Sequence, residues 1–215
     1  MNSSCKLAAF DLDGTLNRTE LFAVEALQDT QRELGFPVQS AETLISLFGA
    51  PASEYIPLIL PGADEETVAR YRRIVPEKEK QYIHQAKAYD GAAEMLDALH
   101  AAGYTTAVCS NSSNRYISLV LRSIGLFEKI DLIQPLEQGM DWKGESLKHL
   151  LEKTAPQSAV MIGDTRYDFE AAAFNGIPFI GCLYGFRPHE IAGLPHLVER
   201  PADLTEAVLR LSSLA

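Results

Sequence analysis

The 215-residue chain is predicted to fold as an α/β protein, with a doubly wound parallel sheet and an inserted all-helical domain. Three observations lead to this prediction. Short apolar runs alternate with helical patterns over the C-terminal two-thirds of the chain, which indicates βαβ units. Apolar strands separated by helices are typical of a parallel sheet that is covered on both faces. The residues between about 17 and 88 break this rhythm, because none of their patterns resembles a buried strand.

The elements of the sheet domain follow in order along the chain. We expect strands at 7–10, 104–109, 130–133, 158–162, 177–181 and 196–198. We expect helices between them at 92–102, 113–124, 144–153, 168–175 and 202–211. Gly103 and Gly125 follow the first two of these helices, at the position where a left-handed residue commonly ends a helix.

The inserted segment is predicted to contain helices only. Apolar residues fall near helical spacing over 21–34, and shorter helical pieces follow at 41–48 and around 55–60. A further helix is expected from 64, where an acidic run suits a helix N-terminus, to 75, where Pro76 ends or kinks it. Helical residues resume over 81–87. We therefore predict a core domain of residues 1–16 and 89–215, and a helical domain of residues 17–88.

Composition excludes several classes of protein. With 19 basic and 29 acidic residues the net charge is −10, which argues against a general nucleic-acid binder but not against a small anionic substrate. The chain has no apolar run of the ~18 residues that a membrane span needs, and Asp11 interrupts the only apolar stretch near the N-terminus. Three cysteines without a CxxC pattern argue against disulfides and a zinc site, and reduced thiols suit the cytoplasm.

Two pairs of carboxylates follow predicted strands. Asp11 and Asp13 stand in AAFDLDGTL (8–16), and Asp164 and Asp168 stand in VMIGDTRYD (160–168). Ligands gather at the carboxyl ends of strands in open α/β sheets, although a turn in the first motif and helix N-caps in the second would explain these residues equally simply. Carboxylates brought together repel unless a cation lies among them, and hard oxygen ligands suit Mg²⁺.

Two further positions suit the binding of an anion. Ser110 and Asn111 follow the strand at 104–109, where a hydroxyl and backbone N–H groups at a helix N-terminus can hold an anion; simple N-capping is the alternative. Lys143 begins a predicted helix, where a cation opposes the helix dipole and is expected to face a compensating anion. A solvated lysine is the alternative reading of that position.

The order DxDGT, Ser-Asn, Lys and GDxxxD resembles that of the haloacid dehalogenase-like hydrolase superfamily. The resemblance covers essentially the whole chain. Its helical insertion is similar to the helical cap of the phosphoglycolate phosphatase and β-phosphoglucomutase branch, so the resemblance implies a Rossmann-like core below a cap. After Lys143 the chain reads GES where relatives commonly have Pro-x-Pro, which weakens the similarity to the β-phosphoglucomutase type.

The resemblance implies a role for each of these residues. Asp11 would be the nucleophile that forms an aspartyl-phosphate, and Asp13 would be the general acid and base. Phosphoryl oxygens would be held by Ser110, Asn111 and Lys143.

The resemblance also implies a Mg²⁺ site. Asp164 would bind the ion together with Asp11 and the backbone carbonyl of Asp13. Asp168 would either bind the ion or orient it from outside the ring of residues that contact it directly.

Two positions are candidates for substrate specificity. Arg18 stands where many relatives have an acidic residue, so it could meet a second anionic group of the substrate. Alternatively Asn17 and Glu20 cap the first inserted helix and Arg18 is solvated. Gly49 lies in the loop FGAPAS (48–53), where Gly49 and Pro51 suggest a shaped turn.

The sequence thus predicts a Mg²⁺-dependent phosphatase, phosphoglycolate phosphatase-like, that acts on a small phosphorylated metabolite. It is expected to be a cytoplasmic monomer or small homo-oligomer that binds neither nucleic acid nor membrane. A hexose-phosphate mutase of the β-phosphoglucomutase type is the alternative enzyme, and a non-catalytic binding protein is a third hypothesis.

Overall fold

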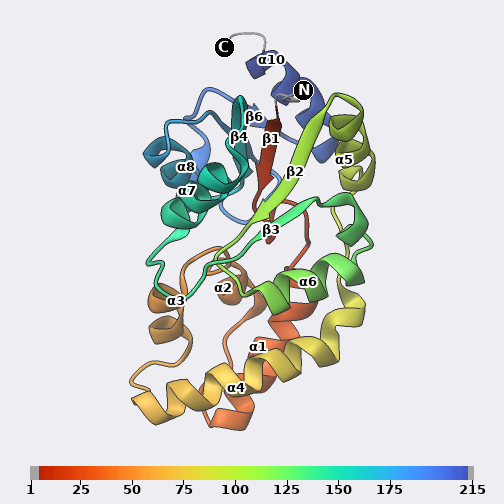
Figure 1. Cartoon of the computed structure of the whole chain (residues 1–215). Helices are drawn as coiled ribbons and strands as arrows, with labels where there is room; N and C mark the ends of the chain where they lie inside the picture. The colour runs from red at the N-terminus through yellow and green to blue at the C-terminus, as the bar shows by residue number, and fades with distance from the viewer. Residues whose placement is uncertain (1–4, 213–215) are drawn as a thin grey trace.

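A single six-stranded sheet organises the computed structural model, which describes residues 5–212 (Figure 1). Every pair of neighbouring strands is parallel, in the order β3-β2-β1-β4-β5-β6. The strands are β1 (Lys6–Phe10), β2 (Tyr104–Cys109), β3 (Leu132–Gln134), β4 (Ser158–Gly163), β5 (Phe179–Cys182) and β6 (Leu197–Val198). The predicted doubly wound sheet is confirmed. Because the chain runs outward from β1 on one side and from β4 on the other, the order reverses between these two strands, where a crevice forms.

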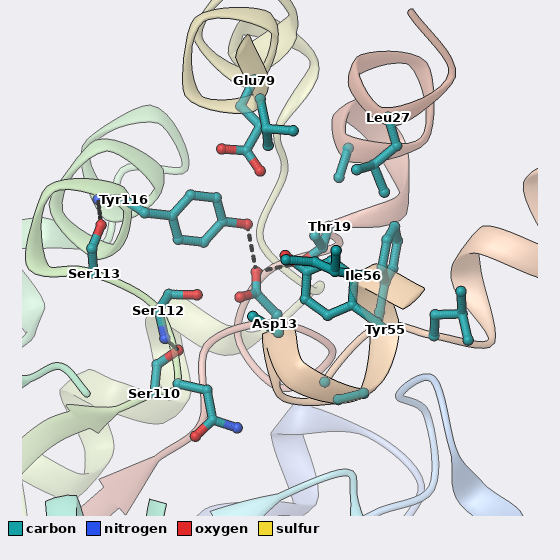
Figure 2. Close-up of a pocket in the computed structure, with 18 of the residues that line it drawn as sticks. Asp13, Thr19, Leu27, Tyr55, Ile56, Glu79, Ser110, Ser112, Ser113 and Tyr116 are labelled. Carbon is teal, nitrogen blue, oxygen red and sulfur yellow. Dashed lines mark hydrogen bonds between the residues drawn. The ribbon is translucent and has the colours of Figure 1, made fainter. Parts of the chain in front are cut away.

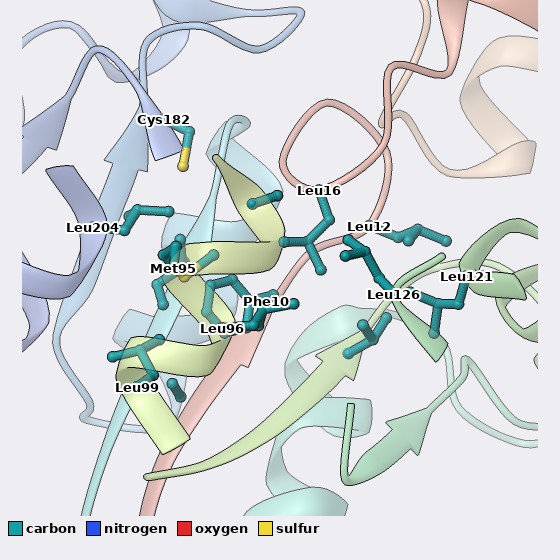
Figure 3. Close-up of a cluster of buried hydrophobic side chains, with 14 of the residues drawn as sticks. Phe10, Leu12, Leu16, Met95, Leu96, Leu99, Leu121, Leu126, Cys182 and Leu204 are labelled. Atoms are coloured by element: carbon teal, nitrogen blue, oxygen red, sulfur yellow. The ribbon is translucent and has the colours of Figure 1, made fainter. Parts of the chain in front are cut away.

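Helices cover both faces of the sheet, as the apolar strands require. Alternate residues of β1 point to opposite faces: Ala8 and Phe10 join one buried cluster, whereas Leu7 and Ala9 join another. The first cluster packs against α5, α6 and α10, and Figure 3 shows Phe10 among leucines of these elements. The helices of the sheet domain are α5 (Ala92–Ala101), α6 (Asn114–Ser123), α7 (Lys143–Thr154), α8 (Arg166–Phe174), α9 (Pro188–Ile191) and α10 (Leu204–Ser212), with 3-10 turns η2 (Phe127–Lys129) and η3 (Pro201–Asp203).

The segment between β1 and α5 is helical, as predicted. It contains α1 (Glu20–Leu34), α2 (Ala41–Ile45), α3 (Ala52–Ile59), α4 (Glu65–Tyr82) and the 3-10 turn η1 (Ile83–Gln85). These helices have a hydrophobic cluster of their own, centred on Leu44, Ile59 and Tyr71. Pro76 was predicted to end or kink this helix; it does not end it, because α4 continues through this residue to Tyr82. Packing of α4 along α1 outweighs the hydrogen bond that proline cannot donate.

Two adjacent segments join the helical insertion to the sheet. The backbone N–H of Arg18 donates to the Lys87 carbonyl at 2.9 Å, and the N–H of Tyr89 donates to the Leu16 carbonyl at 3.0 Å. This pairing holds the insertion over the carboxyl end of β1, as the orange and yellow helices of Figure 1 show. No helix within residues 5–212 is long and apolar enough to cross a membrane.

Candidate active site

Three strands deliver polar residues to one edge of the sheet. Asp11 follows β1, Ser110 follows β2 and Asp164 follows β4. Because β1 lies between β2 and β4, the loops that carry these residues are neighbours. All three side chains are buried, with at most 3% of each residue exposed. The carboxyl edge of the sheet thus forms a buried polar floor below the helical insertion.

Lys143 lies between two carboxylates of this floor. It is the first residue of α7, and its Nζ donates to Asp11 Oδ1 at 2.6 Å and to Asp168 Oδ1 at 2.5 Å. Asp168 is in turn held by Thr165, whose backbone N–H and hydroxyl donate to its second oxygen at 3.1 and 2.7 Å in a capping box at the start of α8. Asp168 therefore positions the ammonium group against Asp11. The predicted anionic partner of Lys143 is a pair of carboxylates.

Asp164 completes a group of three acidic residues. Its oxygens accept hydrogen bonds from the Thr15 hydroxyl at 3.2 Å and from the backbone N–H of Phe186 at 2.7 Å. One carboxylate oxygen from each of Asp11, Asp164 and Asp168 lies within 4.8 Å of the others. This spacing brings hard oxygen donors close enough to share one small cation.

The electrostatics of the group also fit a divalent cation. Burial, opposed by Lys143, raises the pKa of Asp11 to about 7, and burial together with Asp11 raises that of Asp164 well above its usual range. Burial acts to lower the pKa of Lys143, but Asp11 and Asp168 outweigh it and raise the value. One ammonium therefore leaves the three carboxylates under-compensated. A Mg²⁺ ion would supply the missing positive charge.

The Asp13 carboxylate faces the side chains of Tyr116 and Thr19 (Figure 2). Its Oδ1 accepts hydrogen bonds from the Thr19 hydroxyl at 2.5 Å, the Tyr116 hydroxyl at 3.0 Å and Asn17 Nδ2 at 3.2 Å. Burial raises the pKa of Asp13, whereas these three donors act to lower it. The two carboxylates of the first motif thus have different surroundings.

Asn17 does not cap the first inserted helix, which was one alternative from the sequence. The helix begins at Glu20 with Thr19 as the N-cap, and the Asn17 amide bonds to the side chains of Asp13 and Thr19 instead. Arg18 lies outside the cavity described below. Its side chain is 46% exposed and pairs with Glu20 at 2.9 Å. The structure therefore brings Asn17 to the site and leaves Arg18 at the surface.

The Ser-Asn pair after β2 does not serve as a helix cap either. Ser113 is the N-cap of α6 and accepts from the Tyr116 N–H at 3.3 Å. Ser110 is buried and accepts from the Ser112 N–H at 3.2 Å, and both Ser110 and Asn111 line the cavity. Their polar groups face the floor of the site, within the same cavity as Lys143.

A cavity of about 400 Å³ separates the polar floor from the helical insertion. Its floor contains Asp11, Asp13, Ser110 and Lys143, and its opposite wall comes from α1, α3 and α4. Gly49 also lines it, with a φ of 83°. A Cβ at Gly49 would lie 2.7 Å from Thr165 Cγ2, so only glycine allows the loop to approach the sheet domain this closely.

Several residues of the site were not identified from the sequence. They are Thr15, Thr19, Glu79, Tyr116 and Phe186, which contact the predicted carboxylates or line the cavity. Tyr116 stands 103 residues from its partner Asp13, and no spacing rule connects such positions. An anion bound in this cavity would lie between a carboxylate paired with an ammonium and a second carboxyl able to exchange a proton.

Comparison with known proteins gives a consistent family. Residues 8–182 match the model of the haloacid dehalogenase-like hydrolases. A phosphoglycolate phosphatase of Agrobacterium fabrum is 30% identical over 192 residues, which cover 84% of this chain and 81% of that protein. A phosphoglycolate phosphatase of Thiobacillus denitrificans is 29% identical over 192 residues, which cover 84% of each chain.

Solved structures share the fold. A predicted phosphoglycolate phosphatase from Haemophilus somnus matches with a TM-score of 0.85 and 19% identity, over 99% of this chain and 100% of that one. CbbY from Rhodobacter sphaeroides, in complex with phosphate, matches with a TM-score of 0.77 and 22% identity, over 92% and 95% of the two chains.

Proposed function

The chain belongs to the haloacid dehalogenase-like hydrolase family, and we propose that it is a Mg²⁺-dependent phosphatase that cleaves a small phosphate monoester through an aspartyl-phosphate on Asp11. One observation carries this proposal. Asp11 is buried 2.6 Å from the Lys143 ammonium, and it faces a cavity that also contains the separate carboxyl group of Asp13. A nucleophile, a compensating positive charge and a proton donor therefore lie around one cavity.

In the first half-reaction the Asp11 carboxylate attacks phosphorus, and the bond between phosphorus and the ester oxygen breaks. Lys143 and the polar groups of Ser110 and Asn111 hold the phosphoryl oxygens, so that phosphorus faces Asp11. Asp13 donates its proton to the departing alkoxide. The hydrogen bonds from Thr19 and Tyr116 keep the Asp13 carboxyl oriented towards the leaving group.

In the second half-reaction Asp13 accepts a proton from a water molecule. This water attacks phosphorus, the bond to Asp11 breaks, and inorganic phosphate leaves. Asp13 is then protonated again and ready for the next ester. The reaction therefore consumes one water molecule for each ester.

The three acidic residues suit the metal of this reaction. We assign Asp11, Asp164 and the backbone carbonyl of Asp13 as Mg²⁺ ligands, and Asp168 as the residue that positions Lys143 beside them. When bound, Mg²⁺ supplies the positive charge that lets a carboxylate approach a phosphate dianion.

We further assign residues 1–16 and 89–215 to a catalytic core and residues 17–88 to a cap. The cap contributes the wall that faces the reacting groups across the cavity. The paired segments at Arg18 and Lys87 would be the hinge on which it opens to exchange substrate and product.

Release of inorganic phosphate tests the function. The wild-type protein should hydrolyse p-nitrophenyl phosphate and members of a panel of phosphorylated metabolites with Mg²⁺, and should lose this activity in EDTA. Asp11→Asn should lower kcat/KM by at least about 1,000-fold, since the amide is a poor nucleophile, whereas Asp203→Asn at an exposed ion pair should not. Activity of Asp11→Asn within tenfold of wild type would contradict the assignment. Isomerisation of a hexose phosphate without phosphate release would instead support a mutase.

A further inference from the structure

The cap wall of the cavity is largely apolar and contains one carboxylate. Side chains such as Leu27, Ile56 and Val75 form most of the surface that faces the catalytic floor. Glu79 of α4 lines the same wall, and Figure 2 shows its carboxylate turned inwards on the side of Tyr116. This residue lies where the organic part of a bound ester has to be placed, since the phosphate occupies the floor.

Glu79 has no hydrogen-bond donor or cation as a partner among residues 5–212. Burial and the nearby Asp13 carboxylate raise the pKa of Glu79 to about 8. A carboxylate in an apolar wall is costly unless a donor reaches it. The protein supplies none, so a donor on the ligand would fill this gap.

The two cations that line the cavity do not serve this purpose. Lys143 is held by Asp11 and Asp168 on the floor. Arg72 is exposed, and it stands seven residues before Glu79 on α4, which places it ~10 Å away along the helix axis. At a pH above the pKa of Glu79, a substrate carboxylate placed beside this residue would thus meet a like charge, with no cation on α4 at that depth.

A second polar group on the same wall also lacks a partner. The hydroxyl of Tyr71 is buried, with only 2% of the residue exposed, and makes no hydrogen bond of good geometry with residues 5–212. Its polar neighbour is the Tyr55 side chain. Tyr71 and Glu79 are two turns apart on α4, and both residues line the cavity.

We propose that the organic part of the substrate is largely apolar, carries a hydroxyl or ammonium group that donates a hydrogen bond to Glu79, and carries no carboxylate or second phosphate. The inference rests on the proposed function, because it concerns the leaving alcohol of the same reaction. Glu79 would then select among phosphate monoesters by the charge at the end of the organic group that lies farthest from the phosphate. Phosphoglycolate, whose far end is a carboxylate, is therefore a poor substrate of this chain.

Matched alkyl phosphates test the inference. We would use chains of two, four and six carbons that end in carboxylate, hydroxyl or ammonium; the two-carbon carboxylate is phosphoglycolate. In the wild-type protein at pH 9, where Glu79 is ionised, the kcat/KM of the carboxylate ester should be the lowest at each chain length that reaches α4. Glu79→Gln should raise kcat/KM for carboxylate esters by about tenfold or more and lower it for ammonium esters by a similar factor. A higher kcat/KM for ammonium than for hydroxyl esters in the wild type would identify the donor as a cation.

Glu66→Gln is the matched control. It removes the same charge from an exposed position of α4 that is ~20 Å from Glu79 along the axis, and should leave the three series in their wild-type order. The inference would be overturned if the wild type preferred carboxylate esters at every length. It would also be overturned if Glu79→Gln changed kcat/KM by the same factor in all three series. Thermal unfolding of each variant checks that it folds.

Failure of the proposed function gives a different result. If no ester, including p-nitrophenyl phosphate, releases phosphate with Mg²⁺, the phosphatase assignment fails. Calorimetric affinities of Asp11→Asn for the same three series would then still decide whether Glu79 rejects the carboxylate. Equal affinities for carboxylate and ammonium esters in that variant would overturn the inference independently of turnover.

Discussion

Lys143→Met is expected to destabilise the protein in proportion to the buried charge that it leaves uncompensated. The ammonium is 3% exposed and lies 2.6 Å from Asp11 and 2.5 Å from Asp168. Methionine preserves much of the side-chain length and adapts to the site, so packing is largely kept. Loss of one partner of a buried ion pair costs ~3–5 kcal/mol. For a chain of this size each kcal/mol lowers Tm by ~2–4 °C, so Tm should fall by ~6–20 °C.

The pH dependence of this loss identifies its cause. Burial already raises the pKa of Asp11 in the folded state to about 7, and without the ammonium this pKa rises further above that of the unfolded chain. A raised pKa of an acid means that folded stability falls as pH rises and the group ionises. The difference in Tm between wild type and Lys143→Met should therefore be larger at pH 8 than at pH 5, by circular dichroism melts in EDTA.

Two further variants complete this experiment. Lys148→Met on the same helix removes a lysine that is 59% exposed and lies 3.9 Å from Glu152, and should change Tm by less than ~2 °C. Adding Asp168→Asn to Lys143→Met removes one uncompensated carboxylate, and the double variant should melt above the single one at pH 8. A Tm of Lys143→Met equal to that of Lys148→Met, or a larger loss at pH 5, would refute the reasoning.

Three other predictions follow from the contacts of the site. Tyr116→Phe removes one of three hydrogen-bond donors to Asp13. It should lower kcat/KM for an alkyl phosphate by about tenfold, because hydrogen bonds to charged groups contribute ~1.5–3 kcal/mol. A loss below twofold would contradict this role of Tyr116. Gly49→Ala would place a methyl group 2.7 Å from a side-chain methyl of the core, and should lower kcat/KM by about tenfold or more by displacing the loop. Gly62→Ala, also at positive φ but in open space, is its control, and equal kinetics of the two variants would refute it. Since the pKa of Glu79 is raised to about 8, its ionisation destabilises the folded state between pH 5 and 9. The Tm of Glu79→Gln should therefore fall less than that of the wild type over this interval. An equal fall in both proteins would show that Glu79 ionises as it does in water.

Local patterns predicted the fold class because the strands and helices are encoded by neighbouring residues. Short apolar runs separated by helical patterns favour strands covered on both faces, and the helices between them favour parallel pairing. The strand at 104–109 was predicted at its observed bounds, and β4 extends one residue beyond its prediction. The sequence left open whether Pro76 ends or kinks its helix, because the cost of the proline is local, whereas the packing of α4 against α1 that carries the helix past it is not.

The sequence also indicated most of the chemistry of the floor. Asp11, Asp13 and Asp164 were recognisable because each follows an apolar strand, and the carboxyl ends of parallel strands meet at one edge. Lys143 stands at the start of a helix, where a cation opposes the helix dipole, and this position indicated a compensating anion nearby. Their roles in catalysis remain predictions that the variants above test.

Only the tertiary structure decided what surrounds these residues. It turned Asp168 towards Lys143 and brought Tyr116 to Asp13 across 103 positions of the chain. It removed Arg18 from the cavity and placed Glu79 on the wall that faces the organic part of the substrate. The physical reason is range: the preference for a strand or a helix is encoded by residues close in the chain, whereas a cavity wall is formed by elements that meet after folding. The sequence by itself therefore determined the fold class and the candidate residues of the polar floor, and tertiary packing determined the partners of those residues and the shape of the site.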